Sequence, residues 1–208
     1  MAYGGTLSFD DGTTVHRWDL TQETSELLLR QCRDLGLDTA CEARAESRRR
    51  EVLAERLLLH RMGGHDALRH NSDRAPSVAG CPHMSIAHTR RELMIAVNPR
   101  HPIGIDLEGY RRQLLNVRRG FLSEDEQAWL AGDDLRAHAV AWTAKEAVFK
   151  LISVRALVKD YRHDIALQPF AVDESATELH HSATFGGASI TLITRLSSAG
   201  VFTLATTR

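Results

Sequence analysis

Two carboxylates stand two residues apart in the run 103–108, which reads IGIDLE. Short apolar runs of this kind, bounded by turn residues, predict a β-strand. Alternate residues of a strand share a face, so Asp106 and Glu108 point the same way, about 7 Å apart. Such carboxylates repel each other unless a cation lies between them, and a hard divalent ion such as Mg²⁺ is the economical candidate. Taken alone, the hexapeptide favours the simpler interpretation, an exposed strand end that carries two solvated acids.

A second group of charged residues lies in the segment 142–150, which reads WTAKEAVFK. Its apolar spacing predicts a helix, on which Glu146 and Lys150 are neighbours one turn apart. An ordinary ion pair between these two side chains is one interpretation. The other requires the helix to pack on the strand 103–107, where Glu146 would supply a third carboxylate and Lys150 a cation for phosphate.

The composition limits the class of protein. The chain has 208 residues, of which 43% are hydrophobic, so it can form one or two domains with a sizeable core. A net charge of −1 argues against a polybasic protein that binds nucleic acid or a membrane surface. Only three of the 26 basic residues are lysines, and two of them, Lys145 and Lys150, fall within the segment 142–150.

The cysteines and histidines give no sign of a disulfide framework or a zinc site. The three cysteines are far apart, and the histidines form neither an HExxH motif nor a Cys/His cluster. The N-terminus lacks the charged and apolar regions of a signal peptide, and no apolar run is long enough to span a membrane. We therefore expect reduced thiols and a cytoplasmic location.

The elements that must position the charged residues follow from the hydrophobic pattern. Helices are expected over 21–35, 43–62, 123–130 and 135–152, and Ser123 with Glu126 forms a capping box at the start of the third. Strands are expected over 83–87, 93–98, 103–107, 165–172, 177–185, 189–195 and 201–206, with a hairpin at Gly186-Gly187. Helices followed by strands occur twice, so we expect two halves, 1–101 and 102–208.

The two charged segments together resemble the 4′-phosphopantetheinyl transferase superfamily. The strand carrying Asp106 and Glu108 is followed about forty residues later by the pattern WxxKEAxxK, and between them Phe121 to Glu126 is similar to the family's FxSxxE segment. Upstream, the pattern RxxExxAxR from residue 48 to 56 and the loop 85–89 are similar to enterobactin-type members. The resemblance covers about half of the chain. Its spacing is that of the long, two-halved type, which activates enterobactin and surfactin synthetases.

The resemblance implies both a fold and a reaction. The fold would be α+β, a pseudo-twofold pair of similar α/β halves in a monomer, with coenzyme A in the cleft between the halves. The enzyme would be a holo-acyl-carrier-protein synthase. It would move the 4′-phosphopantetheine group from coenzyme A to a serine of an acyl or peptidyl carrier protein and release adenosine 3′,5′-bisphosphate. Mg²⁺, or Mn²⁺ in its place, would be the metal.

The resemblance also assigns roles to individual residues. The metal ligands would be Asp106, Glu108 and Glu146. Glu146, directly or through a water molecule, would take up the serine proton, and Lys150 would stabilise charge on the phosphate. The residues in contact with coenzyme A would be Arg48, Arg56, Arg74, His88, Lys145 and Lys150. Those of the N-terminal half would serve the nucleotide end, and the C-terminal half would carry the metal and the catalytic residues.

Two departures from the family pattern leave alternatives open. Ala87 stands where the family often has serine, and Arg74-Ala75-Pro76 stands where it has Gly-Lys-Pro, so Arg74 would replace the lysine from one position earlier. A non-catalytic homologue that binds coenzyme A or a carrier protein is one alternative. A metal-dependent phosphohydrolase that acts on another nucleotide is the second.

Overall fold

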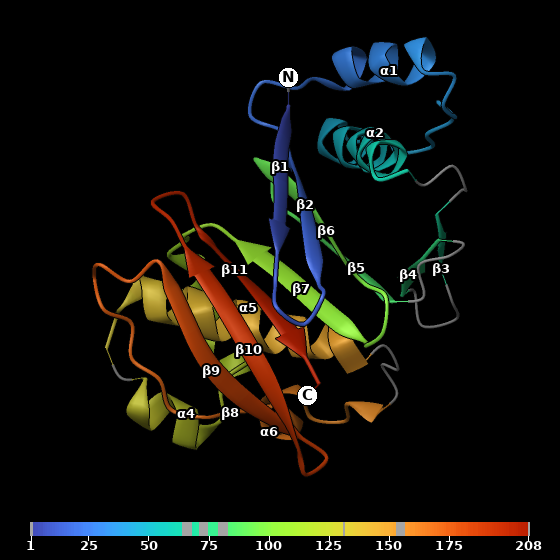
Figure 1. Ribbon diagram of the computed structural model, residues 1–208. Helices are drawn as coiled ribbons and strands as arrows, with labels where there is room; N and C mark the ends of the chain where they lie inside the picture. Colours follow the sequence, from blue (N-terminus) through green and yellow to red (C-terminus); the bar gives the residue numbers. More distant parts are fainter. Residues whose placement is uncertain are drawn as a thin grey trace. The chain divides into compact units, whose positions relative to one another are not determined.

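The computed structural model describes residues 2–63, 68–70, 75–78, 83–130, 132–152 and 157–207. Arg74, one of the residues expected to contact coenzyme A, lies outside these ranges. The contacts between Cα atoms divide the chain into two units. Unit 1 comprises Met1–Asn71 and Pro76–Arg100, and unit 2 comprises Ser72–Ala75 and His101–Arg208. Each unit combines helices with an antiparallel sheet, so the fold is mixed α/β (Figure 1).

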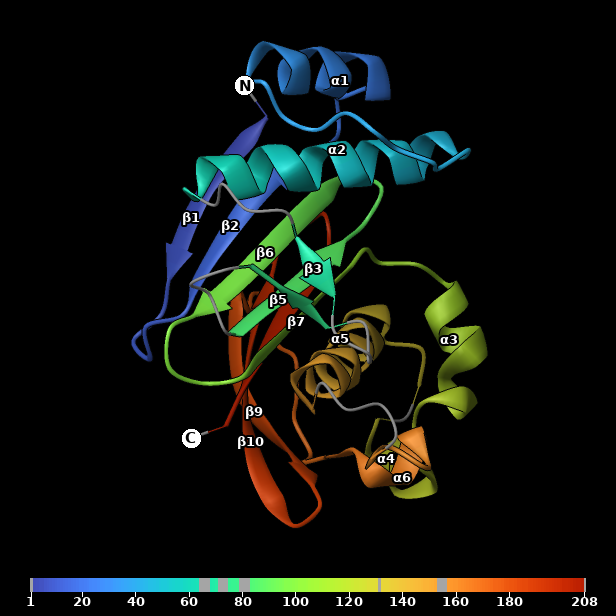
Figure 2. The ribbon, with the colours of Figure 1, turned by 90° about the vertical axis from the view of Figure 1, so that its right-hand side faces the viewer.

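Unit 1 is built on a four-stranded antiparallel sheet with the strand order β1-β2-β6-β5. These strands are β1 (Tyr3–Ser8), β2 (Thr14–Asp19), β5 (His83–His88) and β6 (Glu92–Asn98). The unit also contains the helices α1 (Ser25–Asp34) and α2 (Glu46–Arg61) and a small ribbon of β3 (Arg69–His70) and β4 (Pro76–Ser77). Figure 2 shows α2 lying across the sheet, where Leu53 and Leu57 enter one apolar core with Leu93 and Ile95.

Unit 2 is built on a five-stranded antiparallel sheet with the order β7-β11-β10-β9-β8. The strands are β7 (Ile103–Glu108), β8 (Ala166–Leu167), β9 (Glu178–Phe185), β10 (Ala188–Leu196) and β11 (Val201–Thr206). The helices are α3 (Gln113–Val117), the short 3₁₀ helix η1 (Arg118–Gly120), α4 (Glu124–Trp129), α5 (Leu135–Ile152) and α6 (Tyr161–Asp164). No helix in the described ranges is long and apolar enough to cross a membrane.

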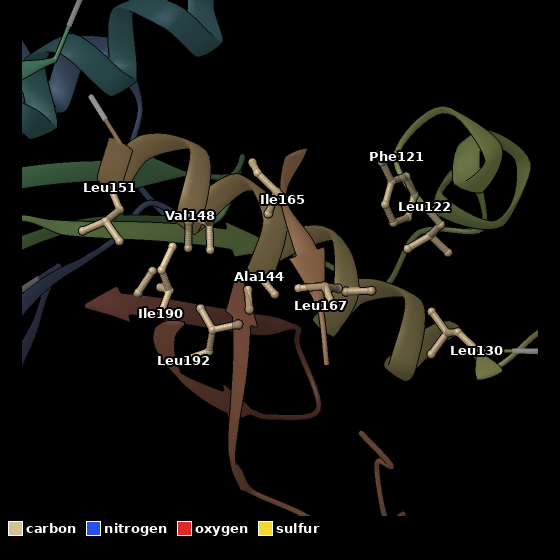
Figure 3. Packing of buried hydrophobic residues seen from close by; sticks show 14 of the residues in the cluster. Phe121, Leu122, Leu130, Ala144, Val148, Leu151, Ile165, Leu167, Ile190 and Leu192 are labelled. Atoms are coloured by element: carbon tan, nitrogen blue, oxygen red, sulfur yellow. The ribbon is translucent and has the colours of Figure 1, made fainter. Parts of the chain in front are cut away.

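Helix α5 forms the core of unit 2 with the sheet. Its buried side chains Ala144, Val148 and Leu151 pack in one cluster with Ile190 and Leu192 of β10 (Figure 3). The helix also lies along β7 and β11. This packing places the helix that carries Glu146 and Lys150 on the strand that carries Asp106 and Glu108.

The contact between α5 and β7 depends on Gly104. A methyl group at this position would lie 1.9 Å from the carbonyl oxygen of Ala147 and 2.6 Å from the backbone nitrogen of Leu151. Both are backbone atoms of α5, which cannot turn aside as a side chain can. Glycine at this point therefore allows the helix to lie directly on the strand.

Gly104→Ala is expected to destabilise the protein by about 1–3 kcal/mol or more, because the added methyl group forces α5 away from β7. Urea denaturation of the variant and the wild type measures the difference. Gly120→Ala is the matched control, since a methyl group there meets no atom within 4 Å. Equal stability of Gly104→Ala and the control would show that the close approach is not needed.

Several expected elements are confirmed. The bounds of α5 are those of the predicted helix 135–152. The capping box is formed, with Ser123 Oγ accepting from the backbone N–H of Glu126 and Glu126 Oε2 accepting from that of Ser123. The hairpin residues Gly186 and Gly187 have φ values of 56° and 82°, as a primed turn requires.

Two expectations were wrong. The chain does not begin with helices, because β1 and β2 precede α1. The glycine-rich edge strand β1 contains a register shift between Tyr3 and Gly5, which weakens its sequence pattern. The strand expected over 165–172 is only the short β8, since Pro169 has no N–H to continue the ladder beyond Gln168.

A row of polar side chains crosses the interior of unit 2. The hydroxyl of Thr203 lies 2.8 Å from that of Thr143 and 2.7 Å from that of Thr194. Nε2 of His181 lies 2.8 Å from the Thr194 hydroxyl. Burial lowers the pKa of His181 to about 4, so this imidazole is neutral at neutral pH.

Acidification is expected to destabilise the protein through His181. Its pKa is 6.5 when unfolded and about 4 when folded, so the unfolded state binds more protons between these values. Stability therefore falls as the pH falls from 6.5 to 4, by about 3 kcal/mol in total for this residue. Urea denaturation at pH 7 and pH 4 measures the loss. The glutamine of His181→Gln cannot titrate in this range, so this variant should lose less stability between pH 7 and pH 4 than the wild type. An equal loss in both proteins would show that His181 is not the cause.

Candidate functional site

The face of β7 that packs against α5 carries two carboxylates, those of Asp106 and Glu108. Gly104 lies against the backbone of α5, and Asp106, two residues on, shares that face. Between the acids, Leu107 points to the opposite face and is buried. Helix α5 therefore packs on the acidic side of the strand, which is the arrangement that the chemical interpretation of the sequence requires.

Asp106 is paired with Lys150. The Lys150 Nζ lies 2.8 Å from Oδ1 of Asp106 and also donates to the carbonyl oxygen of Ile105 at 3.0 Å. Burial raises the pKa of Asp106 to about 6, the Lys150 ammonium opposes this, and the charges of Glu146 and Glu108 raise the pKa further. The lysine thus reaches the strand, and the three carboxylates lie close enough to influence one another.

Glu108 is held by groups that follow it in the chain. The guanidinium of Arg111 donates to Oε2, and the backbone N–H of Gly109 donates to Oε1 at 2.9 Å. Glu108 is buried, whereas the Arg111 side chain is largely exposed. Arg111 therefore supplies the countercharge that a carboxylate needs at this depth. Sequence reasoning missed it, although a cation three residues after an acid is a recognisable local signal.

Glu146 accepts a hydrogen bond from Tyr161 of α6. The phenol hydroxyl donates to Oε1 at 2.7 Å. Burial, followed by the charge of Glu146, raises the pKa of Tyr161 well above its usual value, so the phenol keeps its proton and remains the donor. The Tyr161 ring packs edge-to-face on Phe149, with centroids 5.8 Å apart. Among the described residues, Oε2 of Glu146 has no hydrogen-bond partner.

The donor chemistry of these carboxylates fits a hard divalent cation, because Mg²⁺ prefers carboxylate oxygens. In this arrangement each carboxylate is directed to a partner within the chain: Lys150, Arg111 or Tyr161. Across the ranges that the structure describes, no three His, Cys, Asp or Glu side chains are gathered around a common point where an ion could be held. The residues therefore suit the ion by type, but the structure directs each of them to a partner in the chain and does not gather them around a common point.

Lys145, the other lysine of α5, is enclosed within unit 2. Its side chain has no exposed surface, and its Nζ lies 2.7 Å from Oε2 of Glu126 and donates to the carbonyl oxygen of Arg162 at 2.7 Å. Glu126 also accepts from the backbone N–H groups of Ser123 and Leu167. Desolvation lowers the pKa of Lys145, which the Glu126 carboxylate opposes. This placement favours a structural role over the phosphate contact expected from the sequence.

The remaining candidates lie in unit 1. Glu51 joins two of them, because Arg48 lies 3.0 Å and His88 Nδ1 lies 3.4 Å from its carboxylate. Arg56 donates to two backbone carbonyls of the segment 38–40 and pairs with Asp38. Arg48 is 53% exposed and Arg56 only 26%. Arg48 is therefore open to a ligand, whereas Arg56 fixes a loop.

Residues 102–191 match the model of the 4′-phosphopantetheinyl transferase superfamily. The match lies within unit 2 and includes Asp106, Glu108, Glu146 and Lys150. A search of curated proteins finds no match.

Proposed function

Because residues 102–191 belong to the 4′-phosphopantetheinyl transferase superfamily, we propose that this protein transfers the 4′-phosphopantetheine group of coenzyme A to a serine of an acyl or peptidyl carrier protein. Adenosine 3′,5′-bisphosphate is the second product. Packing of α5 on β7 supports this proposal most directly, since it brings Lys150 to Asp106 with Glu146 nearby. The protein is proposed to act as a cytoplasmic monomer.

The reaction replaces the phosphoanhydride bond of coenzyme A with a phosphodiester bond to the carrier serine. The serine oxygen of the carrier forms a bond to the phosphorus that bears pantetheine, and the bond from that phosphorus to the bridging oxygen breaks. We propose that Glu146 accepts the proton of the attacking serine hydroxyl. Tyr161 holds Oε1 of this carboxylate, which leaves Oε2 to accept the proton. A carboxylate positioned in this way contributes about 10²–10⁴-fold to the rate.

Three carboxylates are proposed to hold Mg²⁺, or Mn²⁺ in its place: Asp106, Glu108 and Glu146. A divalent ion there would neutralise charge on the pyrophosphate. The protein's own contribution is to keep these like-charged groups together, with Lys150 on Asp106 and the Arg111 guanidinium on Glu108.

Lys150 is proposed to bind a phosphate oxygen and to stabilise the charge on the leaving group. Its ammonium is already fixed between Asp106 and the carbonyl oxygen of Ile105, so little ordering is required when the substrate arrives. A compact ammonium can approach a crowded pyrophosphate more closely than a broad planar guanidinium.

Lys150→Ala and Lys150→Arg are therefore both expected to lower kcat by about 10²–10³-fold, the usual cost of losing one preorganised charge donor. Initial rates with coenzyme A and an apo-carrier measure the effect. Circular dichroism confirms that each variant is folded. Near-normal turnover by Lys150→Arg would mean that only the positive charge matters, and that the rarity of lysine in this chain is a coincidence.

We further propose that the chain is a pseudo-twofold pair of similar halves, 1–101 and 102–208, whose bounds are close to those of the two units. The connectivity of each unit supports this. In unit 1, β2 precedes the helices and pairs with the last strand, β6. In unit 2, β7 precedes the helices and likewise pairs with the last strand, β11.

Unit 1 is proposed to contact the nucleotide end of coenzyme A. Arg48 and His88 are brought together by Glu51, and a guanidinium beside an imidazole suits a phosphate group. Arg56 is proposed to contact the same end of coenzyme A from the edge of the loop 38–40, which it fixes. The phosphate contact that the resemblance implies for Arg74 stays a prediction, because this residue lies outside the described ranges.

Acceptor dependence tests the proposed function. The protein is incubated with coenzyme A, Mg²⁺ and apo-carriers of the fatty-acid, polyketide and peptide classes, and the released nucleotide is separated by chromatography. We expect release only when a carrier with an intact serine is present. Release without a carrier would favour a phosphohydrolase. Binding of coenzyme A without release on any carrier would favour a non-catalytic homologue.

A further inference from the structure

Tyr161 lies outside the sequence patterns that indicated the site, yet its hydroxyl donates a hydrogen bond to the carboxylate of Glu146. The donor comes from α6, a four-residue helix that follows α5 in the chain. A glutamate side chain has several rotatable bonds, so the carboxylate of Glu146 has many positions open to it on α5. A single hydrogen bond at 2.7 Å from a fixed phenol selects among these positions.

The phenol itself is held from two sides. Its ring packs on Phe149 of α5 at an interplanar angle of 64°. The N-terminus of α6 is capped by Asp160, whose carboxylate accepts from the backbone N–H of Arg162. Because ring and backbone are both anchored, the hydroxyl has a defined position relative to α5.

The buried pair of Lys145 and Glu126 adds a third anchor. The Lys145 ammonium donates to the carbonyl oxygen of Arg162, the residue directly after Tyr161. Glu126 holds that ammonium at 2.7 Å and is itself fixed by the N–H of Leu167 and by the capping box. The charged pair therefore connects α4, α5 and α6 and supports the helix that carries Tyr161.

We propose that Tyr161 is a positioning residue for Glu146: its hydroxyl orients the carboxylate toward the divalent ion and the serine proton, and the Lys145–Glu126 pair holds α6 in place for this contact. The proposal rests on the role given to Glu146 in the proposed function. It assigns to Lys145 a part in the site that acts through Tyr161 and α6.

Tyr161→Phe tests the proposal, because it removes only the hydroxyl and keeps the ring on Phe149. Loss of a partner that orients a metal ligand costs about 10–100-fold in metal affinity or activity. We expect a loss of this size in Mn²⁺ affinity, measured by calorimetric titration of the protein alone. We expect a similar loss in kcat, with the KM for coenzyme A and the melting temperature unchanged.

Tyr3→Phe is the matched control. This variant also removes a phenol hydroxyl that makes a hydrogen bond, in this case with Thr6. Tyr3, however, lies in unit 1 on β1. Unchanged Mn²⁺ affinity and kcat in Tyr161→Phe, with carrier modification by the wild type intact, would overturn the positioning role and leave the proposed function standing. If the wild type modifies no carrier but Tyr161→Phe binds Mn²⁺ more weakly, the proposed function is overturned and the positioning of the carboxylate by Tyr161 stands.

Discussion

Glu146→Gln is expected to lower the rate of carrier modification by about 10²–10⁴-fold, the range that a general base contributes. The amide has nearly the shape of the carboxylate, and its oxygen can still accept the hydrogen bond from Tyr161. It cannot take up a proton at neutral pH, and it removes one negative charge from the group around Asp106. The fold should be preserved, because Glu146 belongs to neither of the ion pairs, Lys145–Glu126 and Lys150–Asp106, that anchor α5.

Single-turnover rates with coenzyme A and an apo-carrier measure this effect. Glu174→Gln is the control for loss of a carboxylate, since Glu174 is exposed and its side chain is outside the site. A fully active Glu146→Gln would show that another group accepts the serine proton.

Lys145→Met is expected to destabilise the protein by about 3–5 kcal/mol, the usual cost of removing one partner of a buried ion pair. Lys145 and Glu126 are respectively 0% and 2% exposed, so the variant leaves a buried carboxylate with no countercharge. A domain has only about 5–15 kcal/mol of stability in total, so a loss of this size is readily measured by urea denaturation.

The double variant Lys145→Met/Glu126→Gln is the matched control. It removes the uncompensated charge, and the glutamine oxygen can still accept from a backbone N–H. We expect it to recover part of the lost stability. A single variant as stable as the wild type would contradict the structural role and return Lys145 to the list of phosphate contacts.

The different roles of the two lysines show what a sequence pattern leaves out. In the segment 142–150 they look equivalent, and both were expected to contact phosphate. On a helix of 3.6 residues per turn, however, positions five apart differ in direction by about 140°. Lys150 consequently reaches β7, whereas Lys145 points between α4 and α6. Only the packing around the helix distinguishes them.

The strand and helix that form the site could be predicted because their signals are local. Alternation in 103–108 and helical spacing in 135–152 give β7 and α5. Tyr161 could not be found in this way, since a four-residue helix has no periodic pattern and its contact with Glu146 joins residues fifteen apart. The strand β2 was missed altogether, and its pairing with β6 joins segments that are far apart in the sequence, with two helices between them.

Intact-mass spectrometry of an apo-carrier after incubation with the protein, coenzyme A and Mg²⁺ tests the central claim most directly. We predict that the carrier gains the mass of one phosphopantetheine group with the wild type. We predict no gain with a carrier whose acceptor serine is replaced by alanine, and with Glu146→Gln no detectable gain in the time that the wild type needs to modify the carrier fully. Absence of any mass gain across fatty-acid, polyketide and peptide carriers, from a folded protein that binds coenzyme A, would contradict the assignment of this chain as a phosphopantetheinyl transferase.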